Sequence, residues 1–155
     1  MLRLSRIFQR GIATVDIHNF FKNSCERYDR IFSKVNIVKI GNGACVAELK
    51  IEKEHTNPFD GLHGGMIASM VDTLTSYALL THKAAEGVPS VSVDMHVSFL
   101  KGAKCGEEVV INAETIKCGK SMAFAECCIT NKATGEVIAK GNHTKYLINL
   151  NRFTL

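Results

Sequence analysis

The sequence predicts an α+β domain in which one long helix is buried against a curved antiparallel sheet. The chain has 155 residues, enough for one sizeable core and few for two domains. Residues 66–85 form a run whose apolar side chains leave almost no polar face, as is typical of a helix enclosed by other elements. Two strand-like segments precede this run and four follow it. A single helix wrapped by a sheet accounts for this order.

The first 14 residues are predicted to be a mitochondrial targeting segment. Arg3, Arg6 and Arg10 stand among apolar residues, and no carboxylate occurs before Asp16. An arginine-rich, acid-poor amphipathic segment is typical of proteins imported into mitochondria. A disordered basic tail on a cytoplasmic protein is the alternative interpretation. The single folded domain is expected over 15–150.

The domain is expected to begin with an amphipathic helix and a hairpin. Apolar residues at intervals of three, four and seven predict the helix over 15–32. Strands are predicted over 34–40 and 44–53. The glycine–asparagine–glycine sequence at 41–43 suits the positive φ angles of a tight turn, so the two strands should form an antiparallel pair.

A loop and the buried helix lead into four more strands. Asparagine, proline and glycine residues predict a loop over 55–65, before the helix at 66–85. The strands are predicted over 91–100, 108–117, 122–131 and 137–147. In the first of them apolar residues alternate with polar ones, which predicts one buried face made of Val91, Val93, Met95, Val97 and Phe99.

Charge and hydropathy exclude two classes of protein. The net charge is +4, of which the arginines of the first 14 residues supply +3, so the folded part is close to neutral. A nucleic-acid binder usually carries a concentrated basic face, so this class is not expected. Polar or charged residues interrupt every apolar stretch before the roughly 20 residues that a membrane-spanning helix needs.

The cysteines predict neither a metal site nor a disulfide. Six cysteines are present without any CxxC pair, so no zinc site is expected. Cys127 and Cys128 are adjacent and would point to opposite faces of a strand, which makes them poor partners for a disulfide. We expect free thiols in a reducing compartment.

Asp72 is the first candidate for chemistry, because it is an ionisable residue in the middle of the apolar helix. A buried carboxylate is unstable without compensation, so Asp72 must find hydrogen-bond donors, stay protonated or face a cleft. Such a carboxylate can act as a general base on a water molecule. The alternative is a capped or solvent-exposed aspartate.

The segment before the helix holds a second candidate, an oxyanion site. Gly64 and Gly65 at a helix start leave backbone N–H groups exposed, where the positive end of the helix stabilises negative charge on an oxygen. The alternative is that the two glycines only permit a tight turn. His63 beside them is a loop stabiliser, a substrate contact or an acid–base group.

The spacing of the two candidates bears on the oligomeric state. Gly64 and Asp72 are eight residues apart, which is about 12 Å along a helix. Both cannot reach one reacting carbon from the same chain. If both belong to one active site, Gly64 of one chain and Asp72 of a second must share it, and the protein must be a dimer.

Other polar residues carry less specific signals. Ser92 stands early in its strand, on the more polar face, and no GxSxG motif marks a serine nucleophile. Several lysines cluster around the later turns and are either solvated or line a groove for the anionic end of a coenzyme. They are Lys101, Lys104, Lys117, Lys120 and Lys145.

Several short motifs, taken in order, resemble the hotdog-fold acyl-coenzyme A thioesterases. They are His55-Thr56-Asn57, Leu62-His63-Gly64-Gly65, Val71-Asp72, Val91-Ser92-Val93-Asp94-Met95, the segments 117–124 and 130–135, and His143-Thr144-Lys145. The resemblance implies the hotdog fold, dimers with active sites at the interface, and commonly tetramers of two dimers. It also implies hydrolysis of acyl-CoA to a free acid and coenzyme A without an added cofactor.

The resemblance assigns a role to each candidate. The residue matching Asp72 orients or activates the attacking water, and the one matching Gly64 donates its N–H to the thioester oxygen. Asn57 and His63 match positions that hold the water and support the carbonyl, while Ser92 matches a residue that positions the aspartate. The turn that would meet the phosphates of coenzyme A holds Lys117, Gly119, Lys120 and Ser121.

Two departures from the family pattern leave the acyl-chain preference open. They are the bulkier residues at 58–60 and a longer loop after His82. Two other functions also stay open. One is a hotdog hydratase or dehydratase acting on an enoyl or hydroxyacyl thioester, and the other is an acyl-CoA-binding protein without catalysis.

Overall fold

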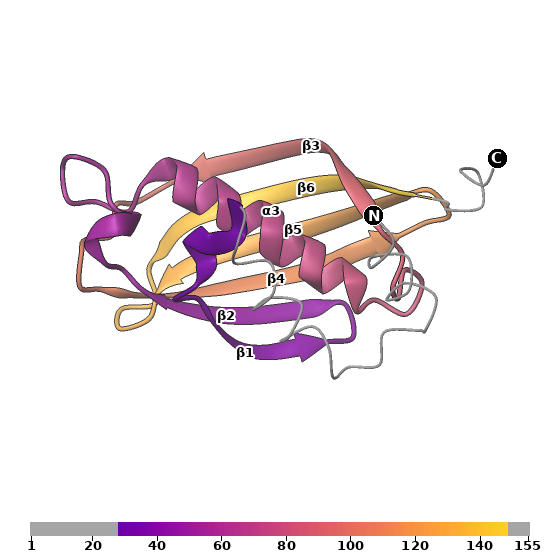
Figure 1. Ribbon diagram of the computed structural model, residues 1–155, viewed down its shortest axis with the longest axis horizontal. Helices are drawn as coiled ribbons and strands as arrows, with labels where there is room; N and C mark the ends of the chain where they lie inside the picture. Colours follow the sequence, from indigo (N-terminus) through magenta and orange to yellow (C-terminus); the bar gives the residue numbers. More distant parts are fainter. Residues whose placement is uncertain (1–27, 149–155) are drawn as a thin grey trace.

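One helix lies across one face of a single antiparallel sheet in the computed structural model, which describes residues 28–148 (Figure 1). The strand order is β1-β2-β4-β5-β6-β3, so β1 and β3 are the edges. The predicted α+β architecture is therefore confirmed. The predicted targeting segment at 1–14, the helix expected before residue 28 and the chain after 148 lie outside the described residues.

The strand bounds agree closely with the sequence pattern. The strands are β1 (Asn36–Gly41), β2 (Ala44–Lys50), β3 (Ser90–Phe99), β4 (Glu108–Cys118), β5 (Met122–Asn131) and β6 (Val137–Leu147). The turn between β1 and β2 has positive φ at both Asn42 (53°) and Gly43 (82°), which confirms the predicted tight hairpin.

Two predicted elements differ in type or length. The described part of the helix expected over 15–32 is a 3-10 helix, η1 (Tyr28–Phe32). The strand expected over 44–53 ends at Lys50, because the chain turns into a second 3-10 helix, η2 (Lys53–His55). The Glu52 N–H donates to His55 Nδ1 at 2.9 Å, and this contact closes the turn.

Helix α3 (Gly64–Leu80) is the predicted buried helix, shifted toward the N-terminus. It begins at Gly64 because the His63 side chain caps it, and it ends at Leu80, where the Thr81 hydroxyl and N–H both bond back to the last turn. Met70, Val71 and Leu74 are fully buried against the sheet. The prediction that the helix continues to residue 85 is wrong.

The helix approaches the sheet most closely at Gly141 on β6. A Cβ atom at this position would lie 2.5 Å from Cγ1 of Val71, which is closer than real Cβ contacts occur. The absence of a side chain at Gly141 therefore brings α3 against β6. Asp72 follows Val71 on the helix, so this close approach also brings Asp72 near β6.

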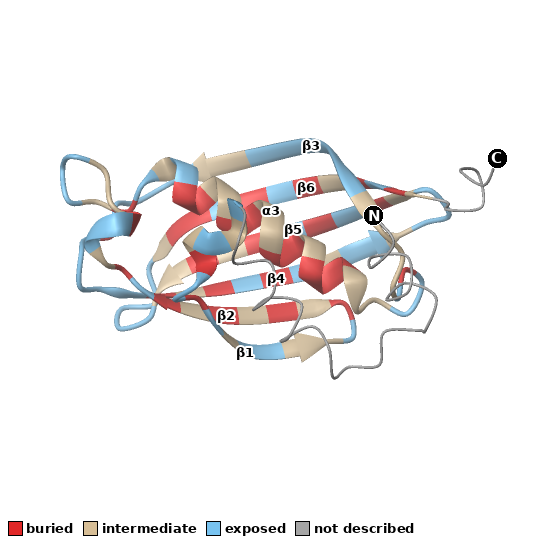
Figure 2. Cartoon of the chain, in the orientation of Figure 1, coloured by how far each residue is buried: buried red, intermediate tan, exposed pale blue. Residues whose placement is uncertain are grey.

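The prediction of one continuous buried face on β3 is wrong for the single chain. A bulge between Ser92 and Asp94 shifts the register, so Val91 lies opposite Tyr146 and Met95 lies opposite His143. Since Tyr146 and His143 are three residues apart, Val91 and Met95 lie on opposite faces. Figure 2 shows β3 as a largely exposed strand, and Val93 is 56% and Phe99 58% exposed.

Candidate active site

A cluster of four polar side chains from three elements lies beside the middle of α3, and we call it the Asp72 cluster. Asp72 belongs to α3, Ser92 to β3, and His143 and Lys145 to β6. The Ser92 hydroxyl donates to Asp72 Oδ1 at 3.2 Å and lies 2.9 Å from His143 Nε2. Lys145 Nζ lies 3.8 Å and His143 Nε2 3.7 Å from Asp72 Oδ1.

Strand alternation and one bulge bring these side chains together. His143 and Lys145 are two residues apart on β6, so both face the helix. Ser92 is paired with Lys145 and Met95 with His143. The bulge at Val93 turns Ser92 toward the helix, although the sequence alternation had placed it among the polar residues of the other face.

His143 is a neutral member of the cluster at pH 7. The residue is 1% exposed, and its Nδ1 atom lies 2.6 Å from the Thr75 hydroxyl of α3. Burial, followed by the positive charge of Lys145, lowers the pKa of His143 from 6.5 to about 4, although Asp72 and Asp94 act in the opposite direction. The neutral His143 ring can therefore form a hydrogen bond with the Ser92 hydroxyl without carrying a charge.

Lys145 is buried, which corrects its interpretation as a solvated lysine or as part of an anion groove. It is 3% exposed, and its Nζ donates to Ser76 at 2.7 Å and to Ser92 at 3.3 Å. Burial lowers the pKa of Lys145, and the nearby Asp72 opposes this shift. The signal that could have found it is period two along β6, where Gly141, His143 and Lys145 follow the buried face.

Asp72 meets one of the conditions that the sequence required, a hydrogen-bond donor, and its partial exposure agrees with the alternative of a solvent-exposed aspartate. Its carboxylate has a hydrogen-bond donor in Ser92, and its side chain is 50% exposed. Within residues 28–148, Ser92 makes the one hydrogen bond to the carboxylate that the geometry supports, and it uses Oδ1. The other oxygen is free to accept a proton from a water molecule at the surface of the chain.

The start of α3 presents an unused backbone donor. His63 Nδ1 accepts the Gly65 N–H at 2.8 Å, and a Cβ at Gly65 would lie 2.9 Å from that nitrogen, so glycine is required there for close packing. No acceptor among the described residues takes the Gly64 N–H. The alternative that the pair only permits a turn therefore fits Gly65, whereas Gly64 keeps a free donor at the helix start.

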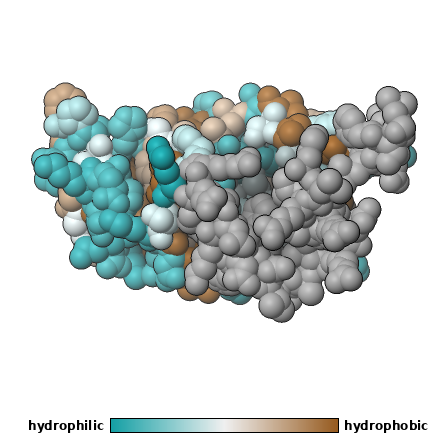
Figure 3. Space-filling view, in the orientation of Figure 1, coloured by the Kyte–Doolittle hydropathy of each residue, from teal (hydrophilic) through white to brown (hydrophobic). Residues whose placement is uncertain are grey.

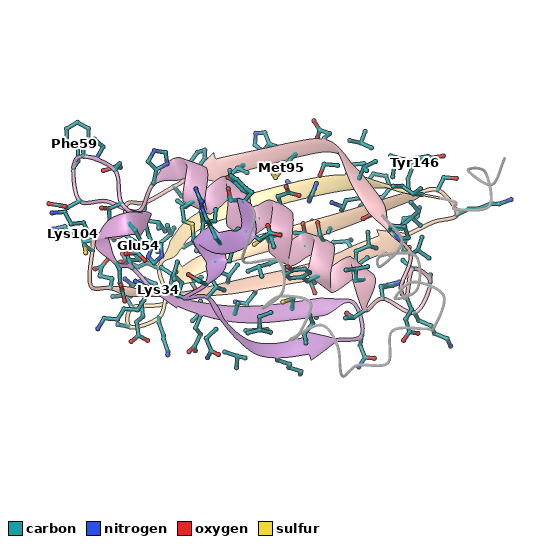
Figure 4. The ribbon with its side chains drawn as sticks, viewed as in Figure 1. Lys34, Glu54, Phe59, Met95, Lys104 and Tyr146 are labelled. Atoms are coloured by element: carbon teal, nitrogen blue, oxygen red, sulfur yellow. The ribbon has the colours of Figure 1, made fainter. Side chains whose placement is uncertain are left out.

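Asn57 organises the loop before the helix. Its Oδ1 accepts the N–H groups of Phe59 (2.9 Å) and Gly61 (3.2 Å). The carboxamide NH₂ has no acceptor among residues 28–148. Phe59 extends from the tip of this loop and is 92% exposed (Figure 4).

The two candidate halves of the site lie apart in one chain. Gly64 and Asp72 are on the same continuous helix, so their backbones are about 12 Å apart along its axis. β3 runs beside both: Phe99, at its end, lies next to Gly64, and Ser92, near its start, bonds to Asp72. One chain therefore presents a carboxylate and an amide donor at opposite ends of one edge strand.

The predicted coenzyme-binding turn lies away from the Gly64 loop. The four residues of this turn are all exposed, and they lie in or beside the connection between β4 and β5: Lys117, Gly119, Lys120 and Ser121. The Gly119 N–H donates to the Met122 carbonyl and closes the turn. Figure 1 shows this turn at the end of the sheet where β3 begins, opposite the 55–63 loop. The structure thus brings these four residues together but not to Gly64 of the same chain.

Cysteine and membrane features of residues 28–148 complete the site description. Cys45 and Cys127 are buried free thiols whose pKa burial raises to about 12. The described residues include no group of three potential metal ligands. No helix in this part of the chain is both long and apolar enough to span a bilayer.

Comparisons with known proteins identify consistent similarities. The family model of the thioesterase superfamily matches residues 59–138. Acyl-coenzyme A thioesterase 13 from Homo sapiens is 44% identical over 122 residues, which cover 79% of this chain and 86% of that protein. The crystal structure of zebra fish thioesterase superfamily member 2 has 40% identity and a TM-score of 0.80, over 84% of this chain and 94% of that one.

A more distant structure is similar in fold. It is a hypothetical thioesterase protein from Streptococcus pneumoniae, solved with coenzyme A. It has 20% identity and a TM-score of 0.75, over 84% of this chain and 96% of that chain.

Proposed function

The chain belongs to the thioesterase superfamily, and from that premise we propose that it hydrolyses acyl-CoA thioesters to a free acid and coenzyme A. The observation that carries the proposal is the half-exposed Asp72 carboxylate, which accepts a hydrogen bond from Ser92 of the edge strand β3. The free Gly64 N–H at a helix start supplies the complementary donor. The 44% sequence identity to acyl-coenzyme A thioesterase 13 supports acyl-CoA as the substrate.

The proposed reaction has two steps. Asp72 takes a proton from a water molecule while the water oxygen attacks the thioester carbonyl carbon, and the Gly64 N–H stabilises the negative charge on the carbonyl oxygen. The intermediate then breaks its C–S bond. The thiolate of coenzyme A receives the proton that Asp72 holds, and the acid leaves. Asn57 and His63 supply further donors to the carbonyl or the water in this proposal.

We infer that two chains share each site through their β3 strands. Antiparallel pairing of two β3 edges about a two-fold axis places the Phe99 end of one strand beside the Ser92 end of the other, and therefore Gly64 near the second chain's Asp72. The exposed Val93 and Phe99 support a buried edge in the assembly. In Figure 3, apolar atoms reach the surface along the upper edge of the molecule, where β3 runs.

A second apolar surface supports a tetramer of two dimers. Val91 and Tyr146 are paired on the outer face of the sheet and are 48% and 37% exposed, and Phe124 on the same face is 45% exposed. We infer that two dimers pack through this face. In the assembly, the turn at 117–121 is proposed to meet the coenzyme phosphates through Lys117 and Lys120.

The experiment that tests the function measures thiol release from acyl-CoAs of graded chain length. We expect turnover by the natural chain and a loss of about 10²- to 10⁴-fold in kcat for Asp72→Asn, which cannot take the proton. Glu126→Gln is the matched control, because Glu126 is exposed on β5 and should keep full activity.

Three results would contradict the proposal or its mechanism. Loss of enoyl absorbance without thiol release would show a hydratase instead. Tight acyl-CoA binding without thiol release would show a binding protein. Near-full turnover by Asp72→Asn would overturn the role of this carboxylate.

A further inference from the structure

We propose that Lys145 is a positioning residue for the hydrolysis: its buried ammonium group holds Ser92 and Asp72 in the arrangement in which Asp72 acts as a base. This inference rests on the proposed function and adds a residue to it. Lys145 does not reach the substrate in this account. It acts through the two side chains that it contacts or faces.

The surroundings of Lys145 are directed toward the catalytic carboxylate. The side chain leaves β6, is buried, and ends between two hydroxyl groups, Ser76 Oγ at 2.7 Å and Ser92 Oγ at 3.3 Å. The Ser76 hydroxyl donates its own proton to the Asp72 backbone carbonyl at 2.6 Å, so it can only accept from Lys145. Lys145 is thus fixed to both the helix turn and the strand that carry the site.

The distance between Lys145 and Asp72 distinguishes this arrangement from an ordinary ion pair. Nζ lies 3.8 Å from Asp72 Oδ1, which is too long for a direct hydrogen bond. The ammonium group therefore stabilises the negative charge without occupying a carboxylate lone pair. The carboxylate keeps its free oxygen for a water molecule, as a general base requires.

Lys145 also decides how Ser92 can use its single proton. Ser92 Oγ has two acceptors within reach, Asp72 Oδ1 at 3.2 Å and His143 Nε2 at 2.9 Å. Lys145 donates to Ser92 and stabilises negative charge on Asp72, which favours donation from Ser92 to the carboxylate. Without Lys145, the closer His143 nitrogen competes for that proton.

The ionisable groups that bear on Lys145 are few. Asp72 faces it from α3, and His143 adjoins it on the same strand; Asp94 of β3 acts on His143. Because His143 is neutral at pH 7, Lys145 supplies the positive charge of the cluster. Replacement of Lys145 by an uncharged residue therefore removes the cation that faces the Asp72 carboxylate.

The test compares Lys145→Met, Lys145→Arg and the control Lys140→Met, which removes an exposed charge from the outer face of the same strand. For Lys145→Met we expect kcat to fall roughly 10- to 100-fold, with KM changed less than about 2-fold. A fall in kcat without a matching change in KM indicates a role in the reaction and not in substrate binding. Lys145→Arg keeps the charge and should keep kcat near that of the natural chain, and Lys140→Met should change neither kcat nor KM.

Binding measurements on the same variants distinguish this positioning role of Lys145 from a purely structural one. Binding of a non-hydrolysable thioether analogue of acyl-CoA reports whether Lys145→Met keeps a folded site. Should this variant not fold, Lys145→Gln replaces it under the same two criteria. A folded uncharged variant with natural kcat would overturn the inference.

The two proposals fail in different ways. Absence of thiol release by the natural chain would overturn the proposed function itself. An active natural chain with an unaffected uncharged variant would overturn only the role of Lys145.

Discussion

Buried polar residues around Asp72 set the charges of the site. His143 donates to or accepts from two hydroxyl groups, those of Thr75 and Ser92, and is enclosed between α3 and β3. Its low pKa means that the folded protein holds this ring neutral under conditions in which an exposed histidine gains a proton. The folded state is therefore sensitive to acid at one identified residue.

The free energy of unfolding should decrease on acidification because of His143. The unfolded chain binds a proton at this ring near pH 6.5 and the folded chain only near pH 4, so the unfolded state takes up more protons between these values. Stability from this residue is present above pH 6.5 and is lost as the pH falls toward 4. We expect a loss of about 2 kcal/mol between pH 7 and pH 5, measured by urea unfolding.

His143→Asn is the comparison for this prediction. It cannot gain a proton in this range, so its unfolding free energy should depend less on pH by a similar amount. Equal pH dependence in the two proteins would contradict the assignment.

The sequence identified part of the site residue by residue. Asp72 was recognisable because a carboxylate interrupts an apolar helix, and Gly64 because glycines precede it. Lys145 was misinterpreted, since a lysine near a turn is usually solvated and only the β6 register places it against Asp72. The contacts of Thr75 and Ser76 depend on the approach of α3 to β6, which no local pattern contains.

Among the elements, α3 and β6 have the tightest fit, at Gly141 and Val71. Replacement of Gly141 by alanine places a carbon where Val71 already lies, so the helix or the strand must move. We expect Gly141→Ala to lower the free energy of unfolding by about 1–3 kcal/mol. A shift of α3 also separates Asp72 from Ser92, so kcat should fall as well.

Gly102→Ala is the matched control for this substitution. Gly102 has no atoms within 4 Å of an added Cβ and no positive φ, so its replacement should change stability by less than about 0.5 kcal/mol. Equal stability of the two variants in urea would contradict the close approach.

Elements were predictable where a local pattern decides them. β5 and β6 have the predicted bounds, because period-two alternation ends at clear turn residues. The bounds of α3 differ from the predicted 66–85 because the His63 side chain sets its start and Thr81 sets its end. The prediction of one buried face on β3 was wrong for two reasons. A bulge cannot be recognised from alternation alone, and β3 is an edge strand of the sheet.

At the scale of the whole molecule, the two sheet edges offer a comparison. Val93 on β3 and Val38 on β1 both stand at a register shift of an edge strand, and they are 56% and 55% exposed. A site shared by two chains requires pairing with a second chain at β3 and at no other edge.

A lysine on each edge should therefore have different effects. Val93→Lys places a charge in the proposed interface and should produce smaller assemblies in gel filtration, with loss of thiol release. Val38→Lys should keep both the assembly and the activity. Identical behaviour of the two variants would remove β3 as the interface.

The sharing of one site by two chains is tested most directly by mixing two inactive variants. Asp72→Asn lacks the base, and Gly64→Pro lacks the N–H donor. Proline is tolerated at the first helical position, and the extended backbone of His63 (φ −65°, ψ 132°) suits a residue before proline. Unfolded together in equal amounts and refolded, the variants should regain about a quarter of the natural activity, since half of the dimers are mixed and each has one intact site. Absence of any recovery, with mixed dimers demonstrated, would contradict the shared site.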